Sequence, residues 1–240
     1  MLAKPGSRFS CAILFLLLGF SGQVFAQCVP PSSLVLNPTV RFAVEEPRLI
    51  YRHDLDLVGL SNYTNTFERA PRGAIVLGLT RRNDPLSLEL QTLQTPSTDG
   101  RICYWVTELD ARLGGADQEV YVAGNYAPGT CEYQTVLDHE STHVAINQEV
   151  LRAYVPILGQ ALRGAVRQRF PVISRDPGLA DRMSEMLMAS VEPVYDQMIA
   201  ELRRRNAAID TPENYRRTSA LCRNWFPPGT PMPDGTLRRK

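Results

Sequence analysis

The segment TCEYQTVLDHESTHVAINQEVL, residues 130–151, contains the features that decide the fold of this chain. Its apolar residues recur at helical spacing, at Val136, Leu137, Val144, Val150 and Leu151. Thr130 is suited to cap the first turn, and Glu132 within that turn complements the helix dipole. The pattern predicts a helix that begins near residue 130 and buries one face.

The same helix carries the pentapeptide His139-Glu140-Ser141-Thr142-His143. Two histidines four positions apart lie on one face of a helix, one turn above the other. Both imidazoles can then bind a single Zn²⁺ at roughly 2.0–2.1 Å. The carboxylate of Glu140 projects near the metal, where it can take a proton from water that the metal has acidified. The pentapeptide therefore predicts a zinc site with Glu140 as general base.

The first 26 residues have the pattern of a secretory signal peptide. Lys4 and Arg8 precede an apolar run over residues 11–20, and Val24-Phe25-Ala26 offers a cleavage site. The apolar run is shorter than the roughly 20 residues that span a bilayer, although a retained anchor is the alternative interpretation. We expect a secreted or periplasmic mature chain of residues 27–240, with no membrane contact after cleavage.

The composition excludes some classes of partner. Loss of the signal would leave 24 basic residues against 25 acidic ones, so nothing in the charge balance indicates nucleic-acid binding. The remaining length suits a single domain with a sizeable core.

Four cysteines lie outside the signal: Cys28, Cys103, Cys131 and Cys222. In an oxidising compartment they predict two disulfides, for which three connectivities exist. A four-cysteine zinc site is disfavoured because no C-x-x-C pair is present. We predict Cys103–Cys131, joining a strand to the start of the motif helix, and Cys28–Cys222, joining the two ends of the mature chain.

The rest of the chain divides into four parts. Residues 27–72 contain many prolines and are predicted to be irregular. Residues 73–125 contain four short strand patterns separated by turns, at 75–79, 86–91, 102–109 and 119–122, which predict an antiparallel meander. Residues 130–207 are predicted to form a helical hairpin, with the break at Pro171 and a second helix begun by Asp176-Pro177. Residues 208–240 form a C-terminal segment. The predicted fold class is α+β, with the meander packed on the motif helix.

This order of sheet, H-E-x-x-H helix and second helix resembles the zincin metallopeptidases over residues 73–215. In layout the chain is most similar to a little-characterised group of secreted bacterial proteins described as zinc-dependent proteases. The resemblance implies an exported zinc-dependent peptidase that acts on peptide or protein substrates. It also implies an edge strand beside the cleft, for which residues 120–122 are the candidate. The alternative is a non-enzymatic exported protein with a structural or regulatory metal site, or with packed structural histidines.

A catalytic zinc needs a third protein ligand, and the hairpin geometry ranks the candidates. With the bend near residue 173, positions 203 and 207 lie opposite His143 and His139. Glu185, which a gluzincin-like arrangement would use, would then lie roughly 25–30 Å away. The candidates at the right level, in order of preference, are Asp210, Glu213 and Glu201. Two of these acids also have a structural alternative, since Asp210 can cap a turn and Glu201 can pair with arginines.

Tyr215 lies in the same acidic segment, five residues after Asp210. A phenol at this position could stabilise the oxyanion of a tetrahedral intermediate. An ordinary packed tyrosine is the alternative.

Overall fold

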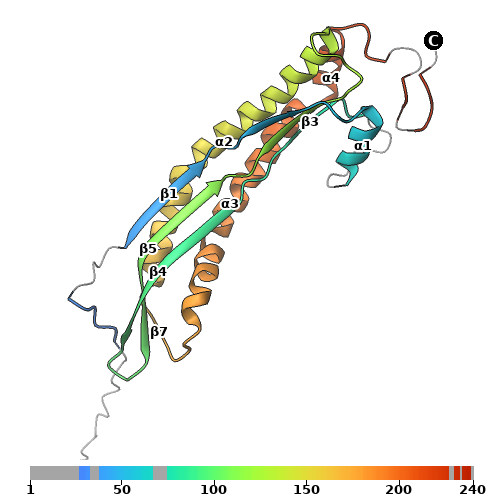
Figure 1. Ribbon diagram of the computed structural model, residues 1–240. Coiled ribbons are helices and arrows are strands. Elements are labelled where there is room, and N and C mark those ends of the chain that lie inside the picture. Colours follow the sequence, from blue (N-terminus) through green and yellow to red (C-terminus); the bar gives the residue numbers. More distant parts are fainter. Residues whose placement is uncertain (1–26, 33–37, 67–74, 227–229, 233, 239–240) are drawn as a thin grey trace, which may run out of the picture.

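The computed structural model describes residues 27–32, 38–66, 75–226, 230–232 and 234–238. The predicted signal peptide, residues 1–26, lies outside the described residues. Two long antiparallel helices form one layer, and strands run along one side of this layer (Figure 1). None of the helices in the described ranges is both long and apolar enough to cross a membrane.

The predicted helical hairpin is confirmed. α2 spans Cys131–Arg169 and continues through Pro156, and α3 spans Leu179–Ile209. Thr130 caps α2, because its side chain accepts a hydrogen bond from the N–H of Tyr133. The start of α3 differs slightly from the prediction. Its N-cap is Gly178, while Asp176 caps the preceding turn by accepting from the N–H of Gly178.

The strands form two mixed sheets rather than a single antiparallel meander, so this part of the predicted fold is wrong. In the first sheet, β1 (Thr39–Glu45), β5 (Ile102–Gly114) and β4 (Leu86–Pro96) are neighbours in that order, and β7 (Val172–Ser174) also pairs with β5. In the second sheet the order is β2 (Leu49–Arg52), β6 (Gln118–Val122) and β3 (Gly78–Arg81). Both sheets combine parallel and antiparallel pairs, because β1 runs parallel to β5 and β2 runs parallel to β6.

Two further corrections concern the location of strands. Residues 38–66 are not irregular, because they contain β1, β2 and the helix α1 (Leu57–Asn65). The candidate edge strand 120–122 belongs to β6, which is the central strand of its sheet; the edge strand on the side of α2 is β3. Of the prolines that suggested irregular structure, Pro30, Pro31 and Pro38 precede β1 and Pro47 lies between β1 and β2, so none of these four interrupts a strand.

The main core lies between the first sheet and the hairpin. Leu109 of β5, Leu162 of α2 and Leu187 of α3 are fully buried there, together with Tyr104. The burial alternates along β4, as its sequence pattern predicted, because Leu86, Leu88 and Leu90 face the helices. The second sheet packs on the N-terminal part of α2, through a smaller cluster that includes Val136. This second contact is the one that positions the candidate site.

The disulfides are Cys28–Cys103 and Cys131–Cys222, so both predicted pairs are wrong. Cys103 lies near the bend of the hairpin, where it pairs with Ile173 of β7 across the sheet. Cys131 begins α2 at the opposite end of that 39-residue helix, roughly 58 Å away along the axis. A disulfide requires Cα atoms within about 7 Å, which this arrangement forbids for Cys103 and Cys131.

The Cys131–Cys222 disulfide joins the start of α2 to the segment that follows α4 (Pro212–Ser219). It closes a loop of 91 residues, so replacing both cysteines by serine should lower the free energy of unfolding by about 2–4 kcal/mol. Denaturant unfolding of the C131S/C222S variant tests this. Peptide mapping without reduction should yield the Cys28–Cys103 and Cys131–Cys222 pairs, and recovery of a Cys103–Cys131 peptide would contradict this fold.

Candidate metal centre

The two motif histidines face a single point from one side of α2. The ring centroids of His139 and His143 lie 4.9 Å apart, and their Nε2 atoms are separated by 3.3 Å. Oδ1 of Asp210 lies 3.1 Å from Nε2 of His139 and 3.3 Å from Nε2 of His143. In the part of the chain that the structure describes, this is the only group of three His, Cys, Asp or Glu side chains that could hold a metal ion.

The spacing of these three atoms fits a small tetrahedral cation. In a tetrahedral zinc site with bonds of about 2.0–2.1 Å, neighbouring ligand atoms lie about 3.3 Å apart. The three observed separations, 3.1, 3.3 and 3.3 Å, are close to that edge length. Two imidazoles and one carboxylate are also ligands that zinc prefers, whereas Ca²⁺ and Mg²⁺ favour sites made of oxygen alone. The group can therefore hold a metal ion, and its donor set suits zinc.

The hairpin brings Asp210 to the histidines, as its register predicted. The observed neighbour of His143 is Asn206 and that of His139 is Asp210, each three positions beyond the predicted levels of 203 and 207. Asp210 also ends α3, where its N–H bonds to the carbonyl of Asn206. The side chain of Thr211 accepts from the N–H of Asn214 and so caps α4. The two interpretations are compatible, because the backbone of Asp210 ends the helix while its carboxylate faces the histidines and remains available as a ligand.

Asn206 fixes the orientation of the His143 ring. The side-chain amide nitrogen of Asn206 donates to the carbonyl of Leu202 and to Oδ1 of Asn147, so its oxygen faces His143. That oxygen lies 2.6 Å from Nδ1 of His143 and can only accept, so Nδ1 carries a proton. In the neutral ring the lone pair is then on Nε2, which is the atom that faces Asp210 and His139. Partners of this kind raise the basicity of a metal-binding histidine.

Sequence reasoning missed Asn147 and Asn206, because neither residue titrates or belongs to the motif. Asn147 lies one turn after His143, and Asn206 lies near the level that the hairpin register assigns to it. Asn147 is only 3% exposed, and a buried amide needs hydrogen-bond partners, so its burial could have identified the pair. Burial, however, cannot be read directly from the sequence.

Glu140 lies on the same helix but faces the second sheet. Its carboxylate is almost fully buried, and Oε2 accepts a hydrogen bond of 2.8 Å from the hydroxyl of Thr80 in β3. The backbone of β3 approaches so closely that a Cβ on Gly78 would lie 2.6 Å from Oε1 of Glu140. Burial raises the pKa of Glu140, and the charge of His143 and the Thr80 hydrogen bond offset this only in part. A carboxylate with a raised pKa beside a metal site is suited to act as a base near neutral pH.

Tyr215 joins the site through Asp210. Its hydroxyl donates to Oδ1 of Asp210 at 2.8 Å, and its ring lies 5.7 Å from that of His139. Burial, together with the neighbouring Asp210 carboxylate, raises the pKa of the phenol well above its usual value. The hydroxyl therefore stays protonated and orients the carboxylate. Half of the tyrosine remains exposed, so the site is open to solvent on this side.

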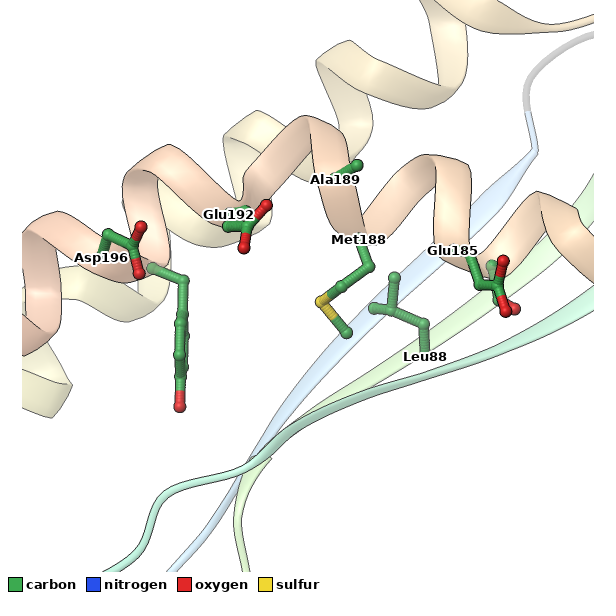
Figure 2. A pocket seen from close by; sticks show the side chains of 8 residues that line it. Leu88, Glu185, Met188, Ala189, Glu192 and Asp196 are labelled. Atoms are coloured by element: carbon green, nitrogen blue, oxygen red, sulfur yellow. The ribbon is translucent and has the colours of Figure 1, made fainter.

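The other acidic candidates lie outside the three-residue group. Glu201 pairs with Arg204 and Arg205, whose hydrogen bonds lower its pKa, and Glu213 pairs with Arg216. Glu185 lies 25 positions before Asp210 on the continuous helix α3, about 37 Å along its axis. It lines a separate groove of about 570 Å³ between α3 and β4, beside Met188 and Leu88 (Figure 2). The third histidine, His53, bonds to the carbonyl of Val122 and lies outside the three-residue group.

No family model, curated protein or solved structure matches this chain. Any interpretation of the centre therefore depends on its geometry and chemistry.

The charges of the site predict how the stability of the metal-free protein varies with pH. Burial alone would lower the pKa of His143, but its hydrogen bond to Asp210 and the charge of Glu140 outweigh this and raise it to about 9. The protonated ring therefore stabilises the fold fully below the unfolded pKa of about 6.5, and this contribution is lost as the pH rises through about 9. We expect the free energy of unfolding in EDTA to fall by on the order of 3 kcal/mol between pH 6.5 and 9.5. Urea unfolding measures this, and an equal fall in His143→Gln would contradict the assignment to His143.

The amide contact predicts a role for Asn206 in metal affinity. Asn206→Leu removes the acceptor that holds Nδ1 of His143 and should weaken zinc binding about 10–100-fold. Asn206→Asp keeps an acceptor at the same place and should retain the affinity. Competition with a chromogenic chelator provides the measurement, with thermal unfolding as a check on folding. Equal losses in both variants would show that the acceptor does not position the ligand.

Proposed function

We propose that this chain is an exported zinc-dependent hydrolase of zincin type, and specifically a peptidase. The observation that carries the proposal is the position of Glu140, a buried carboxylate with a raised pKa next to the His139–His143–Asp210 group. A purely structural metal site has no need for such a base. Zinc, when bound, supplies an acidified water, with a pKa near 7, and polarises a carbonyl group.

Glu140 acts as the general base in this proposal. Its carboxylate takes a proton from the attacking water and later delivers that proton to the leaving amine. The Thr80 hydroxyl donates to Oε2 and so fixes the orientation of this carboxylate. Tyr215 holds Asp210 in the ground state, and its protonated hydroxyl is also available to stabilise developing negative charge on the substrate oxygen.

β3 is the element suited to hold an extended peptide. Within the described residues it pairs only with β6, so its outer edge is open to strand addition. Its residues Gly78 and Thr80 lie directly against Glu140. A substrate strand added to this edge would therefore pass beside the general base.

Export is the proposed setting. The two disulfides are compatible with an oxidising compartment, and the signal-like pattern of residues 1–26 agrees with it.

The alternative is a non-enzymatic protein with a structural or regulatory metal site. The direct contacts among His139, His143 and Asp210 would serve such a site equally well. Structural zinc sites, however, usually have four protein ligands and are closed. Here the described residues provide three candidate ligands, and the side chain of Asp210 is 37% exposed. The open fourth position favours the enzymatic proposal.

Two variants separate the proposals. Wild-type protein should bind one zinc per chain and cleave members of a broad peptide library. Glu140→Gln should keep the zinc while hydrolysis falls about 10²–10⁴-fold, because the base is lost. Glu149→Gln, on an exposed part of the same helix, is the control and should leave both properties unchanged.

The measurements are metal analysis of the purified protein and the rate of peptide cleavage. Protein that takes up no zinc would contradict the whole proposal. One zinc per chain without any cleavage would leave the structural or regulatory alternative.

A further inference from the structure

A second, smaller pocket of about 310 Å³ adjoins the candidate metal centre. His139 and Thr142 of α2 form one wall, and the other wall comes from Thr211 and α4. His139 is shared between this pocket and the metal-binding group. A substrate group in this pocket would therefore lie close to a carbonyl held at the metal.

The pocket lies on the opposite side of the metal-binding face from Glu140. On a helix with 3.6 residues per turn, position 140 lies about 100° to one side of position 139, and position 142 lies about 60° to the other. Thr142 accordingly lines the pocket, whereas Glu140 faces β3. The general base and the pocket thus flank the metal centre, as a catalytic group and a substrate subsite would.

The pocket has one positive charge with which no carboxylate of the described residues forms an ion pair. Its charged lining residues are Glu213 and Arg217. Glu213 is paired with Arg216, whereas Arg217 donates a hydrogen bond of 2.6 Å from Nη2 to the amide oxygen of Asn214. Asn214 is itself fixed, because its amide nitrogen donates to the carbonyl of Ile209. Arg217 is therefore held in place by a neutral partner. Because a guanidinium has five N–H donors, others remain available to bind a ligand.

We propose that Arg217 is a specificity-determining residue that selects substrates with a carboxylate next to the scissile bond. Arginine binds carboxylates through two parallel hydrogen bonds, and its planar fork suits this better than a point charge does. The carboxylate is either an Asp or Glu side chain or the free C-terminus of the peptide, and these share one chemistry. This inference rests on the proposed peptidase function, which it deepens by naming the class of substrate.

The test compares peptides that differ in one charge. A peptide that the zinc-loaded protein cleaves is remade with Glu or Gln at each position flanking the scissile bond, and with a free or an amidated C-terminus. A charge-assisted hydrogen bond predicts that kcat/KM for the anionic member of one pair is at least about tenfold higher. The pair that shows the preference identifies the source of the carboxylate.

Arg217→Gln should abolish this preference, so that kcat/KM for the anionic peptide falls to the value for its neutral counterpart in the same variant. Arg203→Gln is the control, because it removes the same charge from the neighbouring α3 without lining the pocket, and it should retain the preference. Zinc content and thermal unfolding verify that the variants are folded.

The outcomes distinguish the two proposals. Cleavage with no preference for any anionic peptide, or an equal loss in Arg203→Gln, would overturn the role of Arg217 while leaving the peptidase function intact. Failure of zinc-loaded wild-type protein to cleave any peptide would overturn the peptidase function and this inference together.

Discussion

The antiparallel packing of α2 against α3 is the constraint on which the candidate site depends. Two histidines on one helix face the same side of that helix but provide only two candidate ligands. A third must come from another element, at the same height along the helix axis. The hairpin provides that level, because residues equidistant from its bend lie side by side. Asn206 and Asp210, one turn apart at the end of α3, therefore meet His143 and His139, one turn apart on α2. The register of the hairpin thus positions a candidate ligand, Asp210, and also Asn206, which orients the candidate ligand His143.

The close approach of β3 to α2 is the second constraint. Glycine at position 78 allows the strand to lie against the helix, since a side chain there would collide with Val136 and Glu140. The approach buries Glu140, and burial is the largest cause of its raised pKa. The same approach brings the hydroxyl of Thr80 onto the carboxylate. The packing of β3 and the raised pKa of Glu140 therefore both depend on the glycine at position 78.

The sequence predicted the elements that follow local rules. The helical period and cap of α2, the break before α3 and the alternation in β4 were each visible as short-range patterns, and simple hairpin geometry then led to Asp210. Predictions that needed long-range knowledge were wrong or missing. The parallel pairs of β1 with β5 and of β2 with β6 are not joined by a short turn that the sequence would reveal. The disulfide pairing depends on which end of the hairpin the cysteine of β5 lies near.

The charges of the centre show how it could hold a cation. Burial alone would raise the pKa of Asp210, but hydrogen bonds to both histidines hold it well below its usual value, so this carboxylate is ionised. Its negative charge, with that of Glu140 nearby, raises the pKa of His143 to about 9, so without metal a proton on the ring balances the site. Nδ1 is already committed to Asn206, and that proton therefore occupies Nε2, the atom that a metal would need. A divalent ion replaces the proton with more charge at the same point, so binding should release a proton and strengthen as the pH rises. Asn206, which orients His143, and the carboxylates of Asp210 and Glu140, which set its charge, thus both favour replacement of the Nε2 proton by a metal ion.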